Sequence, residues 1–110
     1  MTLSDYISQV LAGYTCLPDT PDRHSRSDRA LARSLHQRDV PLSLVRHAML
    51  LATIRRHYRD PALPPLEPIH SLHYFLPLIR QLTTSPLEPF YAEHLRRKLA
   101  DIQATSRCDP

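Results

Sequence analysis

Arginine side chains are the groups in this sequence whose type and spacing best suit chemistry. Thirteen of the fourteen basic residues are Arg, and most of the basic residues fall into three groups. The first group is Arg23, Arg26, Arg29, Arg33 and Arg38, the second is Arg55, Arg56 and Arg59, and the third is Arg96, Arg97 and Lys98. The planar guanidinium binds phosphate through two parallel hydrogen bonds and stacks on bases. We therefore expect these groups to bind the phosphate backbone of a nucleic acid.

The overall charge agrees with such a partner. A net charge of +3, with His neutral, favours acidic partners, although only mildly. The alternative is that a GC-rich genome raises the Arg, Ala and Pro content and that no function follows. The two explanations predict different arrangements of the three groups in the folded protein. Groups that merge into one surface would follow a phosphate backbone, whereas three dispersed groups favour the compositional explanation.

A second candidate site lies in residues 30–54, where the stretch SLHQRDVPLSLVRHAM has the shape of a helix, a Pro-marked turn and a second helix. In a helix-turn-helix motif the second helix places its N-terminal residues in the major groove. Here Arg46 could reach guanine or phosphate, with Ser43 and His47 beside it. The internal packing would come from Leu31, Leu35, Val40, Leu44 and Val45. Two observations favour an ordinary packed corner instead: the turn HQRDVP is longer than the usual connection of about 3–4 residues, and the second helix is largely apolar.

Histidines raise the question of a metal site. The sequence contains His24, His36, His47, His57, His70, His73 and His94. Only His70 and His73 form a close pair, whereas structural zinc needs paired Cys and His ligands at two defined spacings. We therefore expect no metal and no cofactor. His47 and His73 are expected at the edge of the core, with hydrogen-bonded ring nitrogens.

Catalytic groups have little support in the pattern. Acidic residues stand at helix starts and in loops, where capping accounts for them, and no Ser-His-Asp order or nucleophile elbow occurs. The tyrosines fall on apolar faces at helical spacing and are expected in the core: Tyr6, Tyr14, Tyr58, Tyr74 and Tyr91. The alternative for Tyr74 is a base-stacking platform together with Phe75. We expect a protein that is not an enzyme and has no small-molecule substrate.

The elements that must position these residues are helices. One Gly and eleven Pro argue against a strand-rich fold with many tight hairpins. Apolar residues recur at helical spacing in five segments: residues 3–14, 27–38 and 41–59, a part of 71–86, and 88–103. The third segment is apolar almost all round, which is typical of a buried helix. We expect an all-α fold in which residues 1–110 form a single domain, a compact bundle of about five helices with a central buried third helix.

Capping residues and prolines set the expected helix boundaries. Ser27 or Asp28 can cap the second helix. Pro77 lies in the first turn of the fourth helix if that helix starts near Tyr74, and there it costs little. A start at Ser71 would instead place Pro77 inside the helix and kink it.

A Pro-rich connecting strap separates the third and fourth helices. Residues 60–70 contain four Pro and cannot be helical. Leu63, Leu66 and Ile69 recur every third residue, the period of polyproline II, so one edge of the strap is expected to pack on the bundle. The polar residues 104–110 are expected to form a frayed tail.

The remaining features concern setting and partners. No apolar run approaches the roughly 20 residues of a membrane span, and the stretch MTLSDYISQVL lacks the basic start of a signal peptide. Cys16 and Cys108 are isolated and form no disulfide framework, so a reducing, cytoplasmic setting is the simplest. We expect the backbone of DNA or RNA as the partner, with the protein as an accessory subunit of a larger assembly and without membrane contact. The alternative is a helical adaptor that binds another protein and no nucleic acid.

Overall fold

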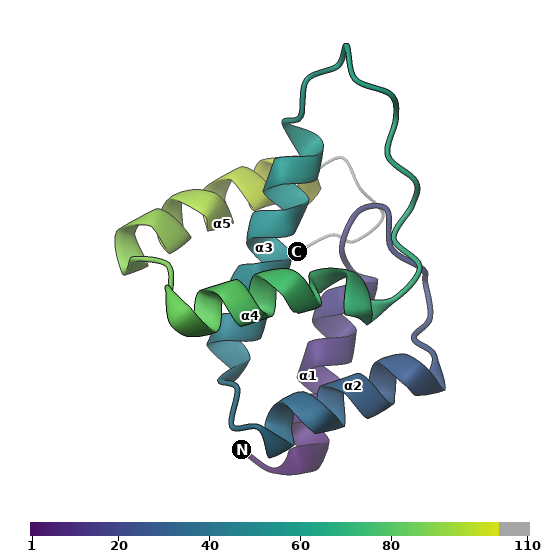
Figure 1. The fold of residues 1–110 in the computed structure, drawn as a ribbon, viewed down its shortest axis with the longest axis vertical. Coiled ribbons are helices and arrows are strands. Elements are labelled where there is room, and N and C mark those ends of the chain that lie inside the picture. The colour runs from purple at the N-terminus through teal and green to yellow at the C-terminus, as the bar shows by residue number, and fades with distance from the viewer. Residues whose placement is uncertain (104–110) are drawn as a thin grey trace.

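The computed structural model describes residues 1–103 of the chain. Within this range it contains five α-helices, one short 3₁₀ helix and no strand, which confirms the all-α prediction (Figure 1). The α-helices are α1 (Leu3–Thr15), α2 (Arg26–Gln37), α3 (Leu42–His57), α4 (Leu76–Thr84) and α5 (Pro89–Gln103), and the 3₁₀ helix, η1, is Leu72–Phe75. None of the helices in residues 1–103 combines the length and the apolar character needed to cross a membrane. The tail expected at residues 104–110 lies outside the described residues.

Helix α3 is the centre of the fold, as its sequence predicts. It packs against α1, α4 and α5, and half of its residues are buried. One cluster of buried side chains joins α3 to α1, α2, η1 and α4, and a smaller cluster joins α3 to α5. The polar Thr53 is accommodated in this buried helix because its hydroxyl donates to the carbonyl of Met49, 2.8 Å away.

Helix α2 begins earlier than expected. The capping residue is Ser25, not Ser27 or Asp28: the Ser25 hydroxyl accepts a hydrogen bond from the Asp28 backbone N–H at 3.1 Å. The Asp28 carboxylate in turn accepts from the Ser25 backbone N–H at 2.9 Å. This reciprocal pair is a capping box, and it fixes both the start of the helix and the position of the carboxylate.

The start of α4 confirms the later of the two expected boundaries. Ser71 accepts a hydrogen bond from the His73 backbone N–H and opens the single turn of η1. The α-helix proper starts at Leu76, so Pro77 lies in its first turn. Backbone N–H groups there have no partner within the helix, and a residue without an N–H loses nothing.

Residues 60–70 pack on the bundle only at one end. Ile69 is buried, and its backbone N–H donates to the carbonyl of Asp19 at 2.7 Å. Leu63 and Leu66 are about half exposed, and the segment projects beyond the end of α3 as a loop (Figure 1). The expectation that all three apolar residues face the bundle is therefore wrong for two of them. A three-residue period shows which side chains share an edge, but not whether the edge lies against other residues.

The tyrosines divide in the same way. Tyr6 and Tyr14 of α1 are buried, as expected. Tyr58, Tyr74 and Tyr91 are 43–55% exposed, so the prediction that they belong to the core is wrong. Each of the three lies near the end or the beginning of a helix, where apolar periodicity no longer reports what covers the side chain.

Cys16 lies immediately after α1 and takes part in a disulfide. The expectation of isolated, reduced cysteines is therefore wrong for Cys16, and Cys108 lies outside the described residues. Assays of this protein should therefore control the concentration of reductant.

Candidate nucleic-acid interface

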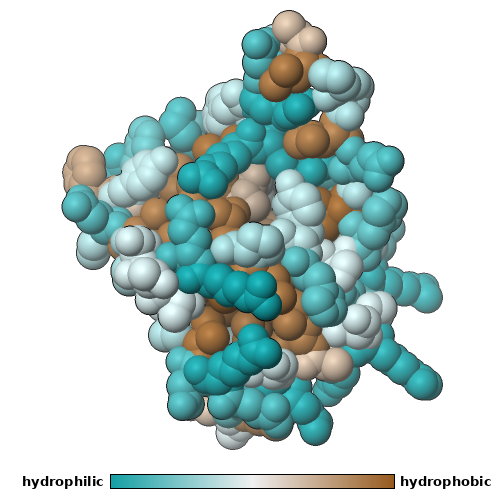
Figure 2. Space-filling view, viewed as in Figure 1, coloured by the Kyte–Doolittle hydropathy of each residue, from teal (hydrophilic) through white to brown (hydrophobic). Residues whose placement is uncertain are grey.

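Helix α2 carries the first group of arginines on its outer face. Its inner face buries Leu31, Ala32 and Leu35 against the rest of the bundle. The exposed arginines of the helix stand three and four residues apart and so form one stripe: Arg26, Arg29 and Arg33. Arg23 precedes the helix, Arg38 follows it, and both are exposed. Hydrophilic side chains project from the molecule where α2 begins, at the lower right of the view (Figure 2).

No acidic side chain of residues 1–103 forms an ion pair with this stripe. Within residues 1–103, none of the five arginines from position 23 to position 38 makes an ion pair or a side-chain hydrogen bond. The one acidic residue of α2, Asp28, faces inward and is 1% exposed. The face therefore carries a local positive potential, which would favour anionic groups.

The position of the stripe on its helix also argues against a structural role. Arg26 is the first residue of α2, and Arg29 follows one turn later. The N-terminal end of a helix carries partial positive charge, so cations there destabilise it by about 0.3–1 kcal/mol. A favourable interaction with the helix dipole therefore does not account for Arg26.

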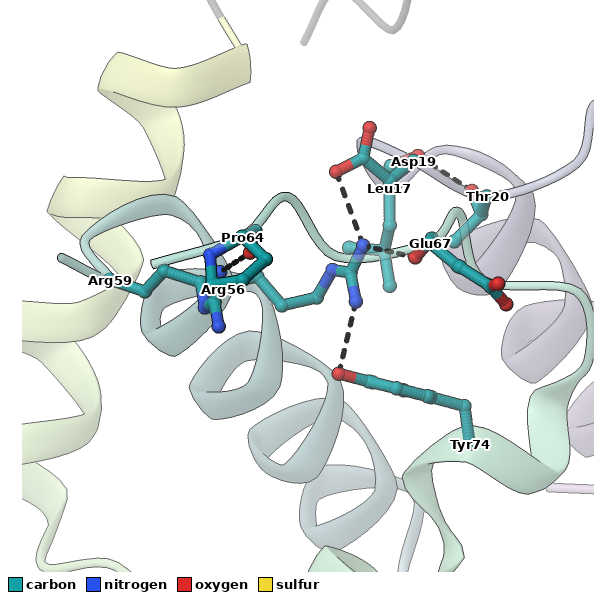
Figure 3. A network of polar contacts seen from close by, with 8 residues as sticks. All are labelled: Leu17, Asp19, Thr20, Arg56, Arg59, Pro64, Glu67 and Tyr74. Atoms are coloured by element: carbon teal, nitrogen blue, oxygen red, sulfur yellow. Dashed lines mark hydrogen bonds and ion pairs between the residues drawn. The ribbon is translucent and has the colours of Figure 1, made fainter. Parts of the chain in front are cut away.

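The second group has a different role. The Arg56 side chain is only 9% exposed, and its guanidinium ties three segments together (Figure 3). It donates to the Glu67 carbonyl at 2.8 Å and to the Tyr74 hydroxyl at 3.2 Å, and it pairs with the Asp19 carboxylate at 3.5 Å. Its central carbon also lies 5.3 Å from the centre of the Tyr74 ring, a cation–π contact. Arg56 therefore holds the loops on both sides of it to α3.

Arg59 acts in the same place. Its guanidinium donates to the carbonyl of Pro64 in the projecting loop. Proline-rich segments present carbonyls without regular partners, and arginines that directly precede such a segment are suited to bind them. Of the second group, only Arg55 is fully exposed and without a side-chain contact among residues 1–103. Sequence reasoning assigned all three to phosphate and did not see that two of them hold the chain itself.

The third group is partly neutralised within α5. Glu93 lies 3.2 Å from Arg96 and 3.9 Å from Arg97. Lys98 places its ammonium 4.8 Å from the centre of the Tyr58 ring. Helices α2 and α5 lie at opposite ends of the molecule, so the three groups do not merge into one surface (Figure 1). By the criterion of convergence, this dispersal favours the compositional explanation for the three groups taken together. The group around α2 is the one whose members are all exposed and make no ion pair or side-chain hydrogen bond among residues 1–103.

The corner between α2 and α3 is organised by α1. The turn spans four residues, shorter than expected, with Asp39 in the left-handed region at φ 58°. Helix α2 packs mainly on α1 and η1, whereas α3 packs on α1, α4 and α5. The Tyr6 hydroxyl donates to the Val40 carbonyl at 2.8 Å and so fixes the turn to α1. Arg46 is exposed but donates to Gln9 of α1 at 2.6 Å. The two helices therefore do not pack mainly on each other, as a helix-turn-helix unit requires.

The histidines are spread over the molecule. In the part of the chain that the structure describes, no group of three His, Cys, Asp or Glu side chains is placed to hold a metal ion. His47 is half-buried with Nε2 3.3 Å from Arg96, and His73 is exposed with Nδ1 2.9 Å from the Ser71 hydroxyl. Burial, and then the charge of Arg96, lowers the pKa of His47.

Asp28 is an important polar residue that the sequence indicated only as a possible helix cap. One carboxylate oxygen accepts from the Leu72 backbone N–H at 2.9 Å and lies 3.4 Å from the Ser71 hydroxyl, and the other closes the capping box. Burial would raise the pKa of this carboxyl, but the hydrogen bonds from Ser25, Leu72 and Ser71 outweigh it and hold the pKa below its ordinary value. The carboxylate thus joins the start of α2 to the start of η1. The S-x-x-D signature could have revealed the capping box, but no local signal reveals a partner 44 residues away.

Comparison with known proteins adds no relative: no family model, no curated protein and no solved structure matches this chain.

Proposed function

We propose that this protein binds the phosphate backbone of DNA or RNA through the outer face of α2, as an accessory subunit of a nucleic-acid-processing assembly. The observation that carries the proposal is the uncompensated arginine stripe of α2, flanked by Arg23 and Arg38. Guanidinium groups on one exposed face contact phosphates without reading base edges, so binding is expected to be insensitive to sequence.

Salt dependence is the direct test. Each phosphate neutralised on duplex DNA contributes about −0.9 to the slope of log affinity against log salt concentration. Five arginines give a slope of about −4.5 if each contacts one phosphate. Fluorescence anisotropy with a labelled duplex and a labelled single-stranded RNA, from about 50 to 200 mM salt, measures this slope. Absence of binding at about 50 mM salt refutes the proposal.

A matched pair of variants separates the stripe from general charge. Changing Arg26, Arg29 and Arg33 to Gln should reduce the magnitude of the slope by about 2.7, since three phosphate contacts are removed. The control changes three exposed arginines on other helices by the same charge: Arg55, Arg80 and Arg97 to Gln. Equal losses in the two triple variants would show that net charge, not α2, is responsible.

A protein–protein adaptor is the second candidate, and exposed apolar side chains favour it. Phe90 is 88% exposed at the start of α5, and Leu63 and Leu66 are half-exposed in the projecting loop, whose tip is partly hydrophobic (Figure 2). A pull-down with and without nuclease distinguishes the candidates. A partner retained after nuclease and lost on Phe90→Ser supports the adaptor, whereas a partner lost on nuclease treatment was bridged by nucleic acid.

A further inference from the structure

A groove with a mainly apolar lining and charged groups at its edge lies between α1, α3 and α5. Its volume is about 330 Å³, at the lower end of the range of small-molecule sites, roughly 300–1,000 Å³. The apolar part of its lining is Gly13, the disulfide-bonded Cys16, Leu17, Met49, Leu50 and Leu99. None of the arginines of α2 lines it, so it is separate from the proposed nucleic-acid surface.

The polar part of the groove carries one uncompensated positive charge. Arg46 and Arg96 both line it. Arg96 is paired with Glu93 at 3.2 Å, whereas the only side-chain contact of Arg46 among residues 1–103 is the neutral Gln9. A ligand carboxylate can replace the Gln9 oxygen and gain a charge-assisted hydrogen bond. The charge of the groove therefore suits a ligand with a single anionic group. His47 also lines the groove. Burial, and then the charge of Arg96, lowers its pKa, which agrees with a groove wall that is poorly hydrated and positively charged.

Gly13 keeps the groove open. It lies inside α1, where glycine destabilises a helix by roughly 0.5–1 kcal/mol relative to alanine. Its backbone has no positive φ, so the conformation does not require glycine. A Cβ at this position would find only the Met49 sulfur within 4 Å, at 3.8 Å. Glycine at this position is thus required neither by the backbone conformation nor by close packing of neighbouring atoms. The space left by the absent side chain is part of the groove.

We propose that this groove binds a small amphipathic monoanion: a carboxylate with an unbranched hydrocarbon tail, its head on Arg46 and its tail along the apolar lining beside Gly13. The ligand class follows from the volume, the apolar walls and the single unpaired cation. This goes beyond the proposed function, since it needs neither α2 nor a nucleic acid.

Isothermal titration of the oxidised protein with decanoate tests the proposal. We expect decanoate to bind at least tenfold more tightly than 1-decanol, which lacks the charge. Affinity should fall about fourfold for each methylene removed on the way to hexanoate, because each buried methylene contributes about 0.8 kcal/mol. Binding weaker than about 1 mM, or equal binding of the acid and the alcohol, overturns the proposal.

Three variants locate the ligand. Gly13→Leu places a side chain in the groove and should abolish binding. Arg46→Gln should weaken decanoate binding by about tenfold to a hundredfold and leave decanol unaffected. Arg33→Gln removes the same charge from α2 and should bind decanoate like the wild type, whatever happens to nucleic-acid binding. Circular dichroism confirms that each variant is folded.

Two outcomes contradict this assignment directly. Equal loss in Arg33→Gln and Arg46→Gln would show that decanoate responds to net charge only. If decanoate does not bind and the protein is a dimer that Gly13→Leu converts to a monomer, the groove holds a second copy of the chain and the ligand assignment is wrong.

Discussion

Replacing Asp28 by alanine should destabilise the protein far more than its place in the first turn of a helix implies. The carboxylate accepts backbone hydrogen bonds from Ser25 and Leu72, both at 2.9 Å, and it is 1% exposed. Alanine leaves the buried N–H of Leu72 without a partner, which costs about 1–3 kcal/mol, and removes half of the capping box, which costs about 0.5–1 kcal/mol. The expected loss in the free energy of unfolding is therefore about 1.5–4 kcal/mol.

Urea denaturation followed by circular dichroism measures this loss, and thermal denaturation should show a midpoint lower by roughly 6–16 °C for a chain of this size. The matched control is Asp5→Ala. Asp5 stands at the same third position of α1, where its N–H bonds to the capping hydroxyl of Thr2, but its side chain is exposed. That variant should lose less than about 1 kcal/mol, since only the interaction with the helix dipole is removed. If the two variants lose the same amount, Asp28 does not bridge α2 and η1, and the reasoning is refuted.

The same carboxylate makes stability depend on pH in a defined direction. Its pKa lies below the ordinary value of 3.8, so its contribution is present above the unfolded-state pKa and is lost as the pH falls through the folded-state pKa. Asp28→Asn keeps the size of the side chain and removes the titration. The stability difference between wild type and Asp28→Asn should be constant from neutral pH to about pH 5 and should shrink below about pH 4. A difference that is independent of pH would contradict the assigned hydrogen bonds.

Further predictions follow from buried groups. Tyr14→Phe should leave the free energy of unfolding unchanged or raise it by about 1 kcal/mol, because the Tyr14 hydroxyl is buried without a hydrogen-bond partner among residues 1–103. Tyr6→Phe should lower the free energy of unfolding by about 1 kcal/mol, because it removes the 2.8 Å hydrogen bond to the Val40 carbonyl. A larger loss for Tyr14→Phe in urea denaturation would contradict this. Burial raises the pKa of both hydroxyls to about 12, so wild-type stability should fall as the pH rises from 10 to 12, and less so in the double Phe variant. Arg56→Ala should cost about 2–3 kcal/mol and its exposed neighbour Arg55→Ala less than about 0.5 kcal/mol; equal effects would show that the guanidinium contacts add nothing. Gly13→Ala should raise the thermal midpoint by the equivalent of about 0.5–1 kcal/mol, since the added Cβ meets only a sulfur at 3.8 Å, and a lowered midpoint would mean that the space is already filled.

The helices and the central place of α3 could be predicted because they follow from local periodicity and local chemistry. Helix α3 is apolar on nearly every side, and that pattern alone requires neighbours all round. Pro77 was placed correctly because the first turn of a helix is the one position that tolerates a residue without an N–H. These inferences need only the residues of one segment.

The errors concern side chains whose surroundings come from distant segments. Arg55 and Arg56 are the same residue type at neighbouring positions, so the sequence does not distinguish them. In the structure the Arg56 side chain is nearly buried between two loops, whereas Arg55 is exposed. Leu66 and Ile69 share a polyproline edge, but Ile69 is buried and bonded to the backbone of Asp19, whereas Leu66 is 45% exposed. The sequence therefore predicted that arginines form the candidate site, but not which arginines. A cluster of basic residues in the sequence does not reveal which of them form hydrogen bonds or ion pairs within the folded chain.

The Arg56 contacts have a consequence for how the molecule opens. The loop containing Asp19 and the loop containing Glu67 are far apart in sequence, but they are joined by the Arg56 guanidinium and by the hydrogen bond from the Ile69 backbone N–H to the Asp19 carbonyl. Neither loop can leave α3 without disturbing the other, so the pair should open as one cooperative unit at a free energy below that of global unfolding. The exchange rate of the Ile69 amide hydrogen reports on that opening, and a ligand that orders either loop slows exchange in both.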